Sequence, residues 1–112
     1  MSSGDAAEAL AATFLEARGL RIVARNYRCK FGEVDIIAQS GATMVFVEVR
    51  ARKSGSFGGA AESITAAKRQ KVLVAARHYL TSHRIDCACR FDAVLLMGEP
   101  PQIDWIRDAF GE

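Results

Sequence analysis

Carboxylates interrupt two otherwise apolar stretches of this 112-residue sequence. Glu33 and Asp35 alternate with valine and isoleucine in the first stretch, and Glu48 precedes Arg50 by two positions in the second. Side chains alternate across a strand, so the charged residues of each stretch share one face. Facing carboxylates repel each other and are costly on a half-buried strand unless a cation compensates. Because magnesium prefers oxygen ligands, the pattern predicts a divalent-metal site.

A β-hairpin from Gly32 to Arg52 is expected to position these residues. Val34–Ala38 and Met44–Val49 are rich in β-branched residues, and they flank the turn signal Gln39-Ser40-Gly41-Ala42. Gly32 begins the hairpin, where we expect it to supply backbone freedom for the preceding turn.

The register of this hairpin decides which side chains meet. If Gln39 pairs with Met44, Asp35 lies opposite Glu48. Six residues then form a common apolar face: Val34, Ile36, Ala38, Val45, Val47 and Val49. The same spacing also fits a ladder of ion pairs on a solvated face, and the spacing alone does not choose between the two interpretations.

Two helices are predicted, one on each side of the hairpin in the sequence. The first runs from about Asp5 to Arg18 and carries Glu8 in line with apolar residues. Glu8 is either a ligand or a first-turn carboxylate favoured by the helix dipole. The second begins after Thr65 or Ser63 and ends near Ser82. Lys68 and Lys71 lie one turn apart on it, where they contact a phosphate or only solvent.

Strands are also predicted at Leu20–Tyr27, at Arg90–Met97 and at Gln102–Ile106, the first of them at a sheet edge. The element order is therefore α-β-β-β-α-β-β, an α/β arrangement. A chain of 112 residues buries about two thirds of its unfolded surface, so we expect a single domain spanning 1–112.

Basic residues surround the acidic hairpin, although the formal net charge is only +2. Arg52 and Lys53 open a stretch rich in Gly and Ser, up to Gly59, that we expect to be a mobile loop. An acidic centre within a basic surround suits a polyanion held over a metal ion. It suits plain solubility as well.

We expect a cytoplasmic protein with no membrane span, because no apolar run is long enough and the amino terminus lacks a signal-peptide pattern. Three cysteines do not make an even disulfide set, and Cys87-Ala-Cys89 has the wrong spacing for a zinc pair, so reduced thiols are expected. His78 and His83 have no partner at metal-ligand spacing, and neither is given a role.

The hairpin residues resemble the YraN family of small bacterial proteins. The resemblance rests on Gly32-Glu33-Val34-Asp35-Ile36-Ile37, Val45–Arg52, Phe57-Gly58 and Lys68, and it covers nearly the whole chain. That family is similar to the PD-(D/E)-x-K nuclease superfamily, and most closely to archaeal Holliday-junction resolvases. The resemblance implies a restriction-endonuclease-like fold, in which a mixed central sheet bears the site on its hairpin and carries helices on its faces. It also implies a homodimer.

The resemblance further implies a site for Mg²⁺ or Mn²⁺. The metal-binding aspartate of the superfamily falls on Asp35, its second acid on Glu48, and the residue that lends a backbone carbonyl on Val49. The helical glutamate of the resolvases falls on Glu8. Arg50 occupies the position of the motif's lysine, and arginine is a poor general base because it stays charged, although it can stabilise a phosphate.

Three functional hypotheses result. The first is metal-dependent hydrolysis of phosphodiester bonds in branched or otherwise structured DNA, with Asp35, Glu48 and Arg50 as catalytic residues. The residues expected to contact phosphates are Arg52, Lys53, Lys68 and Lys71. The second is a non-catalytic module that binds nucleic acid, DNA in preference to RNA, as a subunit of a repair or uptake assembly. The third is a protein-interaction module whose basic residues only aid solubility.

Overall fold

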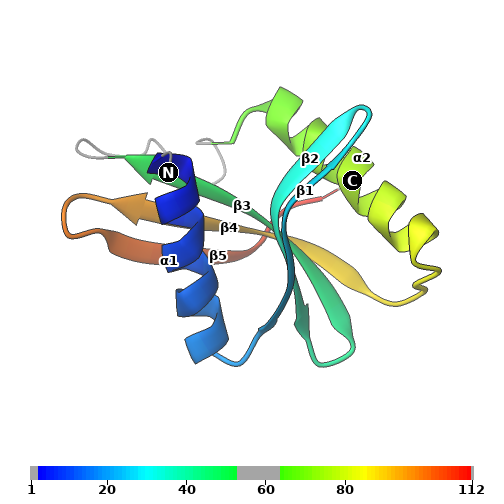
Figure 1. The fold of residues 1–112 in the computed structure, drawn as a ribbon, viewed down its shortest axis with the longest axis horizontal. Coiled ribbons are helices and arrows are strands. Elements are labelled where there is room, and N and C mark those ends of the chain that lie inside the picture. Colours follow the sequence, from blue (N-terminus) through cyan, green and yellow to red (C-terminus); the bar gives the residue numbers. More distant parts are fainter. Residues whose placement is uncertain (1–2, 53–63, 112) are drawn as a thin grey trace.

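The predicted order of elements is confirmed. The computed structural model describes residues 3–52 and 64–111. Their helices and strands are α1 (Ser3–Ala17), β1 (Arg21–Cys29), β2 (Gly32–Ser40), β3 (Thr43–Arg52), α2 (Ala66–Ser82), β4 (Cys89–Met97) and β5 (Gln102–Phe110), drawn in Figure 1. The last strand continues beyond Ile106, where the sequence predicted its end.

The strands form one mixed sheet in the order β1-β2-β3-β4-β5. Neighbouring strands are antiparallel except β3 and β4, which are parallel. A tight turn cannot join parallel strands, so the chain crosses over through α2 between them. β1 lies at an edge of the described sheet, as predicted.

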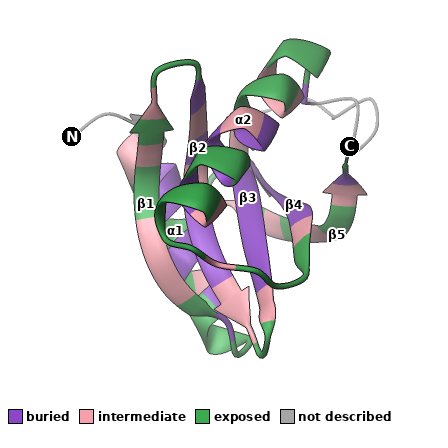
Figure 2. Ribbon diagram, turned by 90° about the vertical axis from the view of Figure 1, so that its right-hand side faces the viewer, coloured by how far each residue is buried: buried purple, intermediate pink, exposed green. Residues whose placement is uncertain are grey.

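The two helices cover opposite faces of this sheet. On one face, Leu15 of α1 packs in a buried cluster with Val47. On the other, Tyr79 of α2 packs in a second cluster with Phe46. Figure 2 shows that burial is concentrated in the central strands between the helices. Neither described helix is long and apolar enough to cross a membrane.

The β2–β3 hairpin has the predicted register. Its pairs run from Ser40 with Thr43, through Gln39 with Met44, to Ile36 with Val47. Asp35 and Glu48 follow as the next residues along the two strands.

The predicted apolar face of this hairpin is wrong at Val34. Ile36 and Ala38 belong to the cluster beneath α1, whereas Val34 belongs to the cluster beneath α2. The alternation of faces is therefore broken between Val34 and Ile36, which is where Asp35 lies.

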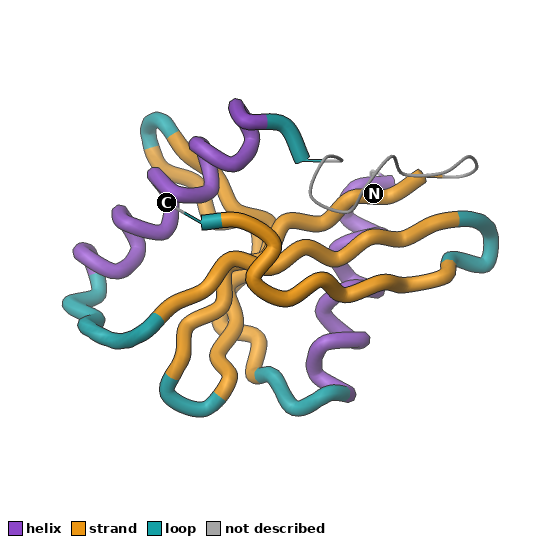
Figure 3. The backbone as a smooth tube through the Cα atoms, turned by 180° about the vertical axis from the view of Figure 1, so that it is seen from behind, coloured by secondary structure: helices purple, strands orange, loops and turns teal. Residues whose placement is uncertain are grey.

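The β1–β2 turn lies beside α2, as Figure 3 shows from behind, and Gly32 is the residue of this turn that approaches the helix backbone. A Cβ atom at Gly32 would lie 2.6 Å from the carbonyl oxygen of Lys71 and 2.7 Å from the backbone nitrogen of Ala75. Its φ is outside the left-handed region, so the predicted reason for the glycine was wrong. The residue is required by the close approach of two backbones.

Candidate functional site

Side chains from four elements meet beyond the last hairpin pair. Glu8 of α1, Asp35 of β2, Arg50 of β3 and Lys68 of α2 line one pocket of about 300 Å³, together with the backbone around Val49. Three of the four predicted metal-site residues, Glu8, Asp35 and Val49, therefore line one pocket, although they are far apart in the sequence.

Asp35 and Glu48 lie side by side, as the register predicted. The backbone N–H of Val49 donates to Asp35 Oδ2 at 2.8 Å and fixes that carboxylate. Glu48 is only 2% exposed and shares a hydrogen bond with Asp35. A solvated ladder of ion pairs is therefore excluded, because its central member is buried.

The environment of Glu48 favours its neutral form. Burial, the hydrogen bond to Asp35 and the negative charge of Asp35 raise the pKa of Glu48 to about 9, while the Lys68 ammonium opposes the shift. A hydrogen bond between two carboxyl groups needs one proton, which Glu48 holds at neutral pH. A cation that binds here must displace that proton.

Glu8 points into the same region from the buried face of α1. The helix begins at Ser3 and has Asp5 in its first turn, so a first-turn role for Glu8 is excluded. Burial and the charge of Asp35 raise the pKa of Glu8, while Arg25 and a hydrogen bond with Asn26 lower it. Glu8 and Asp35 are thus close enough to repel each other.

Three buried polar side-chain atoms lack a hydrogen-bond partner in the described part of the chain: Glu8 Oε1, Glu48 Oε2 and Arg50 Nε. Buried polar groups are almost always paired, so orphaned ones call for a physical cause. Here two are acceptors that a cation would satisfy, and one is a donor that an anion would satisfy. All three belong to the residues predicted for the site.

The carboxylate oxygens at this site suit Mg²⁺, which keeps part of its water shell, better than a metal ion whose ligands all come from the protein. Among residues 3–52 and 64–111, no group of three or more His, Cys, Asp or Glu side chains is arranged to hold a metal ion. Magnesium keeps several waters and binds through one or two carboxylates plus substrate phosphate. The orphaned oxygens of Glu8 and Glu48, with Asp35 beside them, match that need.

Lys68 lies within the carboxylate cluster. The Thr65 side chain caps α2 by accepting from the Lys68 backbone N–H, which confirms Thr65 as the cap and places Lys68 in the first turn. Its Nζ is 3.6 Å from Glu48 Oε2 and 3.8 Å from Glu33 Oε1. The prediction of Lys68 as a phosphate contact missed this neighbourhood.

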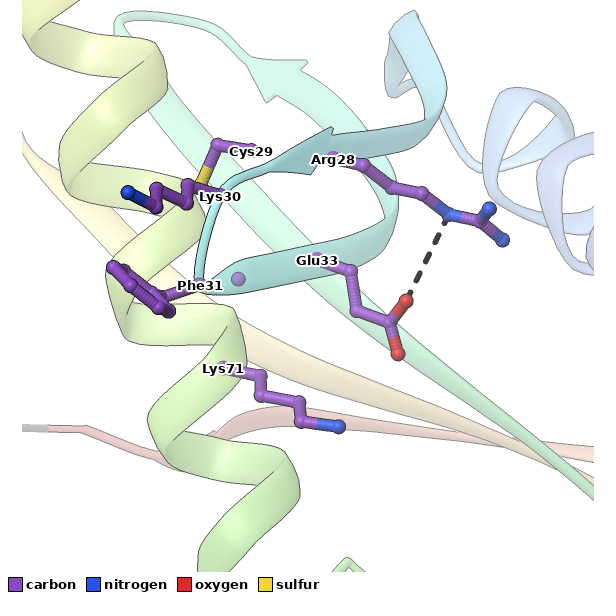
Figure 4. A pocket seen from close by; sticks show the side chains of 7 residues that line it. Arg28, Cys29, Lys30, Phe31, Glu33 and Lys71 are labelled. Carbon is purple, nitrogen blue, oxygen red and sulfur yellow. Dashed lines mark ion pairs between the residues drawn. The ribbon is translucent and has the colours of Figure 1, made fainter.

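The other predicted phosphate contacts are dispersed. Arg52 lines the pocket that contains Asp35. Lys71 lines a different pocket at the β1–β2 turn, shown in Figure 4. Lys53 lies outside the described residues.

Sequence reasoning did not assign Asn26 and Glu33 to the site. Asn26 interacts with Glu8 and adopts a left-handed φ of 54° within β1. Asparagine tolerates this conformation and is depleted in strands, so its place in a β-prone run was a usable signal. Glu33 connects Lys68 to Arg28, whose Nε is 3.7 Å from Glu33 Oε2.

Comparison with known proteins agrees with the resemblance found in the sequence. The profile of the uncharacterised protein family UPF0102 matches residues 7–96, which include every candidate site residue. A UPF0102 protein of Methylobacillus flagellatus is 56% identical over 108 residues, covering 96% of this chain and 95% of the relative. A UPF0102 protein of Nitrosomonas europaea is 53% identical over 112 residues, covering 99% and 95%. The chain therefore belongs to the UPF0102, or YraN, family.

Proposed function

We propose that this protein is a Mg²⁺- or Mn²⁺-dependent endonuclease that hydrolyses phosphodiester bonds in branched or otherwise structured DNA. The observation that supports this most directly is the set of three buried atoms without a hydrogen-bond partner in the described part of the chain, namely Glu8 Oε1, Glu48 Oε2 and Arg50 Nε. Glu8 and Arg50 line one pocket, and Glu48 lies beside Asp35 of the same pocket. A metal ion and a phosphate group together would satisfy all three.

Asp35 and Glu48 would hold the ion through their carboxylates and Val49 through its carbonyl, with Glu8 as an outer carboxylate for the same cation. When bound, the metal would polarise a phosphoryl oxygen and lower the pKa of its water. The hydrogen bond from the Val49 N–H keeps Asp35 oriented before any ligand arrives. Such prior orientation lowers the cost of binding.

Arg50 and Lys68 would together provide the positive charge that the single lysine of the motif provides in the superfamily. The Arg50 Nε, buried and unpaired, would donate to a phosphate oxygen and stabilise the charge that develops there. Lys68 supplies a compact ammonium 3.6 Å from Glu48 Oε2, at the side of the site where the motif's lysine is missing. The departure at Arg50 is thus offset by a lysine from α2.

Cleavage assays with a matched pair of variants test this function. Three proteins are compared: the parent, Asp35→Asn and Asp104→Asn. Each is incubated, in Mg²⁺ or in Mn²⁺, with single-stranded, flapped and four-way-junction DNA. Asp104 is exposed on β5, so Asp104→Asn is the same substitution at a position away from the site. We expect Asp35→Asn to lose at least about 100-fold in rate and Asp104→Asn to retain it. No cleavage of any substrate, or equal cleavage by both variants, would refute the proposal.

A second function, a non-catalytic nucleic-acid-binding subunit of a repair or uptake assembly, is favoured by Arg50 in the lysine position. It predicts DNA binding that falls steeply with salt, without hydrolysis. Calorimetric titration with Mn²⁺ separates the two functions. Saturable binding that Asp35→Asn abolishes supports the enzyme, and its absence at high metal concentration supports the binding module.

A further inference from the structure

Phe31 is an exposed aromatic residue whose side chain does not contribute to the packing of the fold. It lies in the turn between β1 and β2 and is 73% exposed, so it contributes little to either buried cluster. Turns favour Gly, Pro, Asn, Asp and Ser for conformational reasons, none of which applies to phenylalanine. A single exposed apolar side chain is common on protein surfaces, so what points to a ligand here is the set of cations that lines the same pocket as the ring.

Three cations line the pocket that contains this ring, and one of them lies near it. Lys30 Nζ lies 5.3 Å from the centroid of Phe31, and Arg28 and Lys71 line the same pocket of about 350 Å³. Figure 4 shows Lys30 and Phe31 on one side of the turn, Arg28 with Glu33 on the other, and Lys71 projecting from α2. We call Arg28, Lys30, Phe31 and Lys71 the basic tip. Its charge is complementary to a polyanion.

The basic tip packs against α2 and adjoins the candidate site. The close approach of Gly32 to the Lys71 carbonyl fixes the turn on α2. Glu33 then links Arg28 of the tip to Lys68 of the site through ion pairs of 3.7 and 3.8 Å. A strand bound at the tip would therefore continue toward the carboxylates.

An aromatic ring among phosphate-binding cations is the arrangement by which proteins bind single-stranded nucleic acid. Bases inside a duplex are stacked on both faces and cannot reach such a ring. We propose that the basic tip binds an unpaired DNA base by stacking it on Phe31, while Arg28, Lys30 and Lys71 contact the flanking phosphates. The choice of DNA rests on the proposed function and narrows its substrate to DNA with an unpaired nucleotide beside the cut.

Binding without metal tests the tip separately from hydrolysis. Fluorescence anisotropy in EDTA measures the affinity of the protein for two DNAs. One is a single-stranded oligonucleotide. The other is a duplex of related sequence in which each end is closed by a covalent linker that contains no base. Stacking contributes enough per base that Phe31→Ala should weaken single-strand binding roughly 5- to 100-fold. Its affinity for the closed duplex should stay within about twofold, because no unpaired base is offered there.

Two further variants control for loss of folding and of apolar surface. Phe31→Trp keeps an aromatic face and should bind the single strand at least as tightly as the parent. Leu10→Ala removes the other large exposed apolar side chain of the described residues and should leave both affinities unchanged. Unchanged single-strand affinity in Phe31→Ala, or an equal loss on both DNAs, would overturn the proposal.

The outcomes for the tip and for the enzyme are distinguishable. Phe31-dependent binding without Asp35-dependent cleavage supports the tip and refutes the nuclease. Asp35-dependent cleavage with Phe31-independent binding refutes the tip alone. Sedimentation of parent and Phe31→Ala tests the other occupant, a second copy of the chain. A dimer that Phe31→Ala disperses without changing DNA affinity would overturn the proposal.

Discussion

Glu48 is buried beside a second carboxylate, and this makes the stability of the metal-free protein depend on pH. Its pKa is raised from 4.5 to about 9 in the folded state, so the folded protein holds a proton that the unfolded chain has lost at neutral pH. The stability that this group contributes is fully present below about pH 4.5 and is lost as the pH rises toward 9.

Glu48→Gln should therefore stabilise the protein at high pH. Glutamine keeps the shape and the hydrogen bond to Asp35 but cannot ionise. We expect a gain on the order of 1–4 kcal/mol at pH 8 and little difference at pH 4, measured by urea unfolding in EDTA. Glu16→Gln, at an exposed position of α1, should show no such trend. A gain that is the same at both pH values would contradict the raised pKa.

Lys68 and Lys71 lie one turn apart on α2 but in different surroundings, so their variants should differ. Lys68→Gln should slow Asp35-dependent cleavage by roughly 10²-fold or more, because it removes the positive charge beside Glu48, and change DNA affinity little. Lys71→Gln should weaken binding and leave the rate at saturating DNA unchanged. Lys68→Arg should not restore the rate, because a planar guanidinium does not replace a compact ammonium placed between Glu33 and Glu48. Equal effects of the two glutamine variants would argue against a special role for Lys68.

Asp35 and Glu48 could be identified from the sequence because their strands alternate and share one turn. Glu8 was identified through resemblance, and its two interpretations were separated only by the start of α1 at Ser3. The position of Lys68 beside Glu48 depends on the angle at which α2 crosses the sheet. No local pattern encodes that angle, so the sequence placed Lys68 among phosphate contacts.

The elements themselves were largely predictable. The order of helices and strands follows from periodicity and turn residues, and the hairpin register follows from Gln39 pairing with Met44. The face of Val34 was not predictable, because the break in alternation at Asp35 reflects the shape of the whole sheet. The role of Gly32 was also missed, because it depends on contact with a helix some forty positions later.

Gly32→Ala should loosen the β1–β2 turn from α2. The added Cβ meets backbone atoms at 2.6 and 2.7 Å, and backbone cannot move aside as a flexible side chain can. We expect a loss of about 1–3 kcal/mol in the free energy of unfolding, measured by urea denaturation. Gly111→Ala is the control, since its added Cβ would meet nothing within 4 Å. Equal stability of the two variants would show that the turn relaxes without cost.

At the scale of the whole molecule, the attraction of a nucleic acid depends more on where the charges lie than on the net charge. A net charge of +2 is too small to bind a polyanion by itself. The acids are grouped at the pocket between the helices and the sheet, while the cations of the basic tip stand beside it. A nucleic acid would therefore be attracted locally, and its binding should depend on a few phosphates.

The salt dependence of single-strand binding measures how many phosphates these are. Each phosphate neutralised on a single strand contributes about 0.7 to the slope of log affinity against log salt. Changing the three cations of the basic tip to glutamine should therefore reduce the magnitude of the slope by about 2, in anisotropy titrations without metal. A charge-matched control with Arg18, Arg84 and Arg107 changed to glutamine should keep the parental slope, because these residues lie outside the tip. If both triple variants lower the slope equally, attraction comes from overall charge and the tip has no special part in it.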